Sequence, residues 1–365
     1  QSLKQICKTT KANFVVFFIR SDSQTILLFS LSKSKTLLKK CFRINNSYLL
    51  IISLMRIYYL SPNFTEMEKF LVEQCPVCGG KELAPYITCT DFFVSGEKFQ
   101  LFKCINCGFK ITGGIEDEEN IGRYYQSEKY ISHSNTSKGL INSIYHKVRT
   151  YMLSQKRKLV EKAAGMRNGR ILDIGTGTGY FLNEMNRYGW QVSGTEKSPD
   201  ARGFALSEFN LKIMEPEELF RMKGNSFDVI TLWHVLEHIH RLNENMQQFN
   251  LLLKKEGRLI IAVPNHSSYD ARHYREFWAA YDVPRHIWHF APLQMKQFGE
   301  KHGFRLIQTA TMPFDAFYVS MLSEKYKKSK LAFLKGMFHG KISWLSSLVN
   351  KKKCSSVIYV FAKIN

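Results

Sequence analysis

The sequence lacks a long apolar run that could cross a membrane. The most apolar stretch, residues 48–60, contains Arg56 and is about a dozen residues long, whereas a membrane-crossing helix needs about 20 apolar residues. No signal peptide is evident either. We therefore expect a cytoplasmic protein, with peripheral membrane contact as the alternative.

Residues 1–66 have almost no negative charge. Up to Thr65 they hold ten Lys or Arg and one acidic residue, Asp22, and they show no sustained helical or strand periodicity. We interpret 1–66 as a disordered leader or an upstream translation artefact before a natural start at Met67. The alternative is a basic segment that lies on a membrane surface.

The positive charge is large but diffuse. The formal net charge of +21 is spread over the N-terminal stretch and residues 146–170 and 325–353. A diffuse excess usually marks a solvated surface. Because no basic stripe interleaved with aromatic residues is evident, we do not expect nucleic acid as the partner, and an RNA substrate is kept only as an alternative.

Four of the eight cysteines form two C-x-x-C-G motifs: Cys75, Cys78, Cys104 and Cys107. Two such turns can aim four thiolates at one tetrahedral zinc ion, and the pattern is typical of a reducing compartment. A four-thiolate site leaves no open position, so this zinc would be structural. Residues 67–115 are therefore predicted to be a small zinc-ribbon-like module.

Strand and helix patterns alternate beyond residue 168. Seven strand-like segments are predicted: RILDIG, WQVSGTE, LKIM, FDVITLW, RLIIAVPN, FRLIQTAT and SVIYVFAKI. Alternation with helices predicts an α/β fold with a parallel sheet over residues 169–365. Residues 116–168 are expected to form a helical connector or lid, and residues 321–350 a helical insertion.

A glycine turn follows the first of these strands. Gly175, Gly177 and Gly179 give G-x-G-x-G, a turn that presents backbone amides to a ligand at the carboxyl edge of a sheet. The dinucleotide fingerprint would need its third glycine where Tyr180 stands. A nucleotide cofactor other than a dinucleotide is therefore favoured.

Two carboxylates flank this turn. Asp173 lies just before it, and Glu196 ends the next strand, where a carboxylate can accept hydrogen bonds from two ribose hydroxyls. S-adenosylmethionine has those hydroxyls, a methionyl group and no phosphate, so it fits. The alternative for Glu196 is a solvated residue at a strand end.

The segments LDIGTGTG, GTEKS, NSFDVITLWHVLEH and EGRLIIAVPN together resemble the class I S-adenosylmethionine-dependent methyltransferases, from about Arg170 to the C-terminus. The resemblance implies a Rossmann-like seven-stranded sheet whose last strand is antiparallel. The cofactor-binding residues that it implies are Asp173, Gly175, Gly177, Gly179, Glu196, Glu215 and Trp233.

The chain is also similar to bacterial methyltransferases that place a four-cysteine zinc module before the catalytic domain, some of which act on nucleotide-linked sugars. It differs from the sugar C-methyltransferases among them because a further large C-terminal domain is missing. The resemblance implies a small-molecule acceptor, with a saccharide or a nucleotide-linked sugar as one class.

Histidines concentrate in one part of the chain. Seven of the eleven lie between His234 and His289. If the segment HVLEH is helical, His234, Glu237 and His238 share one face. His286 follows in the aromatic segment PRHIWHF, and such a density of rings suits a substrate pocket.

Three roles are open for these four candidate catalytic residues. A histidine such as His286 or His234 could act as general base, because imidazole titrates near neutral pH. His234, Glu237, His238 and His286 could instead bind a divalent metal, as similar E-x-x-E-H motifs do in some ubiquinone-type and small-RNA O-methyltransferases, although His234 replaces the first acid here. The third interpretation is that Glu237 and His238 only orient loops around the cofactor.

The segment YKKSKLAFLKGMFHGKISWLSSLV mixes Lys with large apolar residues. Three interpretations are open: helices that cover the acceptor pocket, helices packed on the sheet, and contact with an anionic membrane. Contact with a membrane would suit a lipid-linked acceptor. The rival to an enzyme is a non-catalytic adaptor built on the zinc module, and the retained Asp173, glycine turn and Glu196 argue against it.

Overall fold

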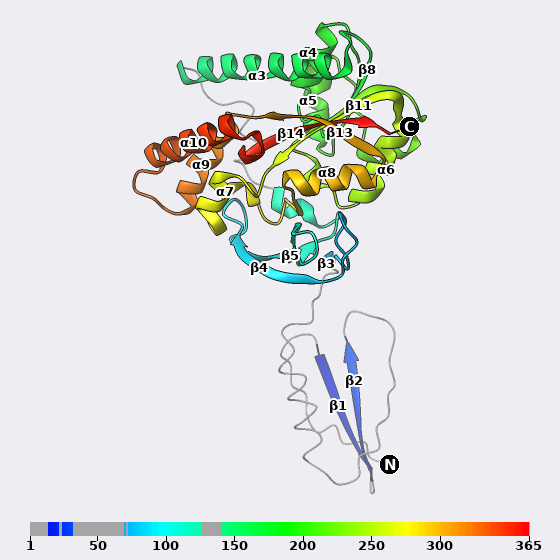
Figure 1. Cartoon of the computed structure of the whole chain (residues 1–365). Coiled ribbons are helices and arrows are strands. Elements are labelled where there is room, and N and C mark those ends of the chain that lie inside the picture. The colour runs from blue at the N-terminus through cyan, green and yellow to red at the C-terminus, as the bar shows by residue number, and fades with distance from the viewer. Residues whose placement is uncertain (1–13, 22–23, 32–68, 71, 126–139, 365) are drawn as a thin grey trace. The chain divides into compact units, whose positions relative to one another are not determined.

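The computed structural model describes residues 14–21, 24–31, 69–70, 72–125 and 140–364 (Figure 1). The chain divides into two units, 1–66 and 67–365. In the first unit, β1 (Phe14–Ser21) and β2 (Gln24–Leu31) form an antiparallel hairpin that the sequence pattern does not predict. The other residues of the leader lie outside the described ranges, so its interpretation stays a prediction.

Two small antiparallel sheets carry the cysteine motifs. Their strands are β3 (Lys69–Phe70), β4 (Leu83–Thr90), β5 (Lys98–Cys104), β6 (Lys110–Thr112) and β7 (Ile115–Glu116), followed by the 3-10 helix η1 (Ile121–Tyr125). The order is β12-β6-β5-β4 in one sheet and β3-β7 in the other. Since β12 (Trp288–His289) comes from much later in the chain, strand pairing joins the cysteine module, residues 72–125, to the part of the chain that follows it.

The large sheet has the order β13-β14-β11-β10-β8-β9. Its strands are β8 (Arg170–Ile174), β9 (Gln191–Thr195), β10 (Phe227–Trp233), β11 (Leu253–Pro264), β13 (Phe304–Thr311) and β14 (Ser356–Lys363). The four strands β11, β10, β8 and β9 are parallel to one another, and β14 is antiparallel to both of its neighbours. This arrangement confirms the predicted Rossmann-like α/β class and the antiparallel last strand.

The prediction of seven strands is wrong for the described residues. The segment LKIM contributes one parallel bridge, between Met214 and Thr195, rather than a strand. Directly after it, Glu215 is the N-cap of the 3-10 helix η3 (Pro216–Arg221), and Pro216 has no amide proton to extend a ladder. The pairing therefore ends after one bridge.

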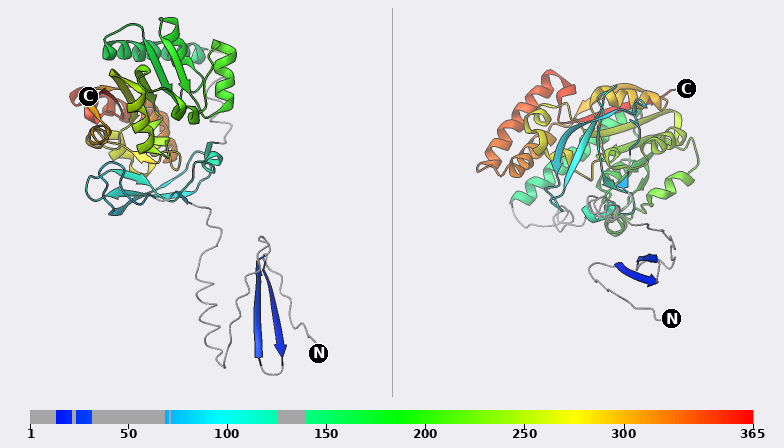
Figure 2. Two further views of the ribbon diagram at one scale, coloured as in Figure 1. Left: turned by 90° about the vertical axis from the view of Figure 1, so that its right-hand side faces the viewer. Right: turned by 90° about the horizontal axis from the view of Figure 1, so that it is seen from below.

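Helices cover both faces of this sheet (Figures 1 and 2). The α-helices are α3 (Leu140–Ala164), α4 (Tyr180–Arg187), α5 (Pro199–Phe209), α6 (Leu242–Leu252), α7 (Tyr269–Tyr274), α8 (Pro292–Lys301), α9 (Asp315–Tyr326) and α10 (Ala332–Val349). The other 3-10 helices are η4 (Leu236–His238), η5 (Arg275–Phe277), η6 (Ala279–Tyr281) and η7 (Lys351–Lys353). Local signals start several of them; the Ser198 side chain, for example, caps α5 by accepting from the amide of Ala201, and Pro199 follows it.

Alternating side chains along each strand separate the two faces. Ile171 and Val229 join the apolar cluster under α3, α4 and α5, whereas their neighbours Leu172 and Ile230 join the cluster that contains α6, α8 and the cysteine module. This is the period of two expected of a strand buried on both faces. The cysteine module therefore shares a hydrophobic core with one face of the sheet.

An α-helical hairpin lies between β13 and β14. It comprises α9 and α10 and starts at Asp315, earlier than the predicted insertion. Gly336 and Gly340 permit a close helix contact, because a Cβ at these positions would come within 2.5 Å of Met321 Cα and 2.8 Å of Phe317 Cα. None of the helices in the described ranges is both long enough and apolar enough to cross a bilayer.

Candidate functional site

The turn after β8 depends on glycine. Gly175, Gly177 and Gly179 have φ values of 64°, 56° and 83°, a region that side chains with a Cβ rarely adopt. A Cβ on Gly175 would lie 2.5 Å from a methyl group of Val235, so the turn packs directly on the segment after β10. A Cβ atom added to Gly177 would have no atom within 4 Å of it apart from its neighbours in the chain, so there is space for a ligand at this point.

The two predicted carboxylates lie beside this turn. Asp173 is 2% exposed and accepts a hydrogen bond from the Thr231 hydroxyl, and burial raises its pKa to about 6. Glu196 accepts from the backbone amides of Gly177, at 2.8 Å, and Ser198, at 2.9 Å. Each oxygen of Glu196 keeps a further lone pair, so the carboxylate can hold the turn and still accept from ribose hydroxyls.

The other two predicted cofactor residues differ in their surroundings. Glu215 is on the surface, with 61% of its side chain exposed and its carboxylate 2.7 Å from Arg202. The Trp233 ring is partly buried and lies between Lys156, 4.5 Å from the ring centre, and Phe181. Its indole nitrogen has no hydrogen-bond partner among the described residues, so it is free to donate to a ligand.

The segment after β10 is not the predicted helix. His234 has a φ of 59°, and only Leu236–His238 form a 3-10 turn, so His234 does not share a helical face with Glu237 and His238. Its Nε2 lies 3.1 Å from the Asp315 carboxylate and its Nδ1 3.4 Å from Glu237. Burial alone would lower the pKa of His234, but the hydrogen bonds to Asp315 and Glu237 outweigh it and raise the pKa to about 10. His234 is therefore an imidazolium at neutral pH.

His238 and His286 form a pair with rings 4.5 Å apart. Nδ1 of His238 lies 3.0 Å from the carbonyl oxygen of Arg285, and Nδ1 of His286 lies 2.9 Å from that of Ala280. Because a carbonyl can only accept, each Nδ1 carries a proton, and Nε2 is the nitrogen of each ring that can offer a lone pair. Burial and the neighbouring His286 lower the pKa of His238 to about 4.

Three of the four predicted catalytic residues therefore converge. Glu237, His238 and His286 each offer a ligand atom within 4.8 Å of the others, whereas His234 contacts Glu237 but is not part of this group. The Glu237 carboxylate is 1% exposed, and His234 and the two other histidines lower its pKa against the effect of burial. Such a group can take a proton from a substrate or bind a divalent cation.

Two residues of the site are not predicted from the sequence. Lys156 on α3 lies near both Asp173 and Asp315, and burial lowers its pKa. Asp315 begins α9 and pairs with His234. The available signal for Asp315 is its place just after the strand-like segment FRLIQTAT, where a carboxylate reaches the same sheet edge; Lys156 carries none, because its helix holds many other cations.

The cysteine module supports the His286 segment. The Arg285 guanidinium, 1% exposed, pairs with Asp91 at 2.9 Å and with Asp282 at 2.7 Å. The Thr112 hydroxyl donates to the carbonyl oxygen of His286 at 2.7 Å. The position of His286 thus depends on contacts that the module supplies.

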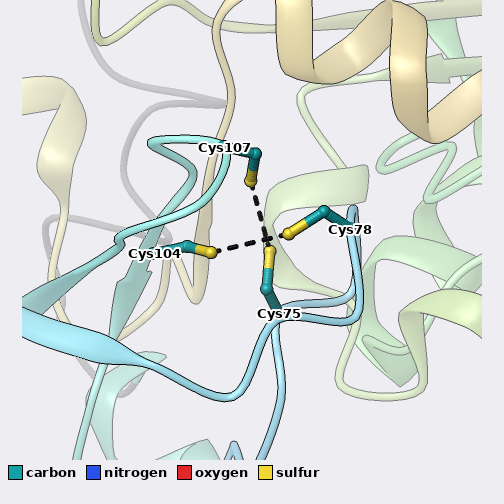
Figure 3. A group of neighbouring side chains, drawn as sticks. All are labelled: Cys75, Cys78, Cys104 and Cys107. Carbon is teal, nitrogen blue, oxygen red and sulfur yellow. Dashed lines mark hydrogen bonds between the residues drawn. The ribbon is translucent and has the colours of Figure 1, made fainter.

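The four predicted cysteines lie together (Figure 3). Cys75 and Cys107 have sulfurs 3.5 Å apart, as do Cys78 and Cys104. Zn–S bonds of about 2.3 Å in a regular tetrahedron would place sulfurs about 3.8 Å apart. Each pair turns at a glycine of positive φ, Gly79 or Gly108, whose amide donates to the carbonyl of the first cysteine of the pair. The set can hold a tetrahedral zinc ion with little rearrangement.

Residues 145–309, which include the glycine turn and the histidine cluster, match a protein-family model described as a methyltransferase domain. Residues 145–309 form a class I S-adenosylmethionine-dependent methyltransferase domain. The class expected from the motifs is confirmed.

Curated relatives of this methyltransferase domain carry the name ubiquinone biosynthesis O-methyltransferase. The protein of Nitrosococcus oceani is 33% identical over 113 residues, which are 29% of this chain and 48% of the relative. That of Pelagibacter ubique is 33% identical over 107 residues, 27% of this chain and 44% of the relative. The chain spans about half the length of the curated relatives it matches.

Solved structures with a similar domain include a SAM-dependent methyltransferase from Archaeoglobus fulgidus. That protein is 20% identical, and the alignment covers 62% of this chain and all of the other, with a TM-score of 0.41. The Haemonchus contortus phosphoethanolamine N-methyltransferase 2, solved in complex with S-adenosyl-L-methionine, is also 20% identical, with 58% and 53% coverage and a TM-score of 0.40.

Proposed function

We propose that the chain transfers a methyl group from S-adenosylmethionine to a hydroxyl group of a small-molecule acceptor, with His286 as the general base. The observation that carries the proposal is a continuous path of contacts from the cofactor turn to the histidine pair. Gly175 packs on Val235, His234 lies between Asp315 and Glu237, and Glu237 lies beside His238 and His286.

The residues around the turn fit the proposed cofactor. Glu196 would accept from the ribose hydroxyls, the open space at Gly177 would admit the methionyl group, and the Trp233 indole would find an acceptor. Lys156 is placed to attract the methionyl carboxylate. When bound, S-adenosylmethionine supplies an electrophilic methyl group on a sulfonium.

His286 has the geometry of a general base. Its Nδ1–H is fixed on the carbonyl of Ala280, so Nε2 can take the proton of an acceptor hydroxyl. The Asp282 carboxylate, 3.9 Å from Nε2, would stabilise the imidazolium that forms. His238, with a pKa of about 4, would remain neutral and could accept a hydrogen bond from the same acceptor.

Metal-assisted deprotonation is the second candidate mechanism. The observation that favours it is the free Nε2 of both His238 and His286 beside the Glu237 carboxylate. Two imidazoles and one carboxylate can hold a divalent cation with positions left for an acceptor oxygen. Glu237, His238 and His286 thus support two mechanisms, general-base catalysis and metal-assisted deprotonation, that experiment can separate.

The acceptor is proposed to be a small molecule. A saccharide or nucleotide-linked sugar is among the classes that suit a four-cysteine module placed before a methyltransferase domain. The relatives named ubiquinone biosynthesis O-methyltransferase support oxygen as the acceptor atom. A structural zinc ion on Cys75, Cys78, Cys104 and Cys107 is part of this proposal.

Replacing Glu196 by alanine is expected to weaken S-adenosylmethionine binding by about 1.5–3 kcal/mol, the range for hydrogen bonds to a charged group. Part of this loss would come from the turn, which Glu196 holds through the amide of Gly177. Calorimetric titration measures it, with Glu217→Ala, an exposed acid on η3, as the control. Equal affinities for the wild type and Glu196→Ala would remove Glu196 from the cofactor site.

A membrane-bound or lipid-linked acceptor is favoured by one further observation. On and beside α10, the exposed large apolar residues are Leu331, Phe333, Leu334, Met337, Phe338, Leu345, Leu348 and Val349. No acidic residue follows Glu324 in the sequence, whereas lysines are frequent there. Apolar insertion and lysine attraction together suit an anionic lipid surface.

This membrane contact predicts sedimentation with liposomes of anionic lipid at low salt and release at high salt, because salt screens the lysine charges. Phe333→Ser and Phe338→Ser are expected to abolish the sedimentation, while Tyr188→Ser, which replaces an exposed aromatic at the end of α4, serves as the control. Protein that stays in the supernatant at both salt concentrations would favour a soluble acceptor.

A further inference from the structure

A second group of metal-ligating side chains lies outside the histidine pair that follows β10. His273 on α7, Glu324 on α9 and His339 on α10 each offer a nitrogen or oxygen atom within 4.8 Å of the other two. Three helices that pack on one another thus each bring one candidate ligand to the same point.

Glu324 is the least accessible of the three. It is 2% exposed, and none of the ion pairs within the described ranges involves it. A carboxylate this buried costs free energy unless a positive charge compensates it, and Lys327 and Lys335 of the adjoining hollow form no ion pair with it. A cation bound beside Glu324 would offset that cost.

The two histidines lie side by side. Their rings are stacked with centres 3.9 Å apart, and Nδ1 of His339 lies 3.3 Å from the Tyr269 hydroxyl. If this Nδ1 donates its proton to the tyrosine oxygen, Nε2 presents its lone pair, as in metal-bound histidines held by an outer partner.

We infer that His273, Glu324 and His339 form a binding site for a divalent transition metal ion, with zinc as the best match. Two imidazoles and one carboxylate suit zinc and leave one position open. A hollow of about 380 Å³, lined also by Lys327, Ser329 and Lys335, borders the three ligands. The lysines oppose a bare cation, so a water molecule or small anion from this hollow is the fitting fourth ligand.

The test is a calorimetric titration of Zn²⁺ into the full chain with its tightly bound metal retained. His339→Ala is expected to weaken one binding event at least ~10-fold, since even outer partners of a metal ligand contribute that much. Glu324→Gln, which keeps the side-chain size, should do the same. Lys335→Ala removes a charge from the same hollow without removing a ligand, so its affinity should equal or exceed that of the wild type.

Cobalt provides a second readout that separates this site from the four cysteines. Co²⁺ bound to nitrogen and oxygen ligands lacks the thiolate absorption that a cysteine site gives, and this thiolate-free signal should disappear in His339→Ala. The inference is wrong if His339→Ala and Glu324→Gln, both folded by circular dichroism, bind Zn²⁺ as tightly as the wild type. It is also wrong if the binding event is lost in Glu237→Gln instead.

Discussion

Cys104→Ala is expected to release the zinc ion proposed for the four-cysteine site and to unfold residues 72–125. Structural zinc contributes an apparent ~10–16 kcal/mol in small zinc modules, so the loss of one thiolate is more than the module's own small core can offset. Elemental analysis and thermal unfolding measure the two effects. Cys89→Ala is the matched control, because Cys89 is also buried in the module but belongs to neither C-x-x-C pair.

The same substitution is expected to reduce methyl transfer, although no cysteine lies in the methyltransferase domain match. Asp91 and Thr112 of the module hold Arg285 and His286 through the contacts at 2.9 Å and 2.7 Å. Once the module unfolds, Arg285 loses a buried partner and the loop that carries His286 loses its support. A variant without zinc that keeps full thermal stability and activity would show that the cysteines have no structural role.

The cofactor side of the site can be predicted from the sequence because its signals are local. The glycines of the turn need positive φ, and Asp173 and Glu196 follow from their places at the ends of two adjacent parallel strands. Only the third strand fails in this region, because Pro216 ends the pairing after one bridge.

The acceptor side follows from long-range packing, which a sequence pattern cannot supply. His234 has the spacing of a helical partner for Glu237 and His238, yet its backbone turns left-handed and its ring pairs with Asp315, 81 residues away. His286 can be identified as a candidate from ring density, but its tautomer depends on the carbonyl of Ala280. The support that Arg285 receives from Asp91 joins residues 194 positions apart.

His286→Ala is expected to lower kcat by ~10²–10⁴-fold, the usual contribution of a positioned general base. Binding of S-adenosylmethionine should be unchanged, since the cofactor turn is held by Glu196 and not by His286. Steady-state kinetics with an acceptor, together with cofactor titration, measure both quantities. His240→Ala is the control, because His240 is also buried near this segment but bonds to the carbonyl of Glu116 instead of joining the cluster.

The pH dependence separates the two histidines that the sequence proposes as base. A base must be unprotonated, so the wild-type rate should fall as the pH is lowered, and this acid limb should be absent in His286→Ala. His234 is already charged, since its partners Asp315 and Glu237 raise its pKa to about 10. His234→Ala should therefore keep the acid limb, whatever activity it loses through the displacement of Glu237. If the acid limb is lost in His234→Ala and retained in His286→Ala, His234 and not His286 is the base. If a chelator inhibits the wild type and a divalent ion restores its activity, the metal-assisted mechanism is favoured instead.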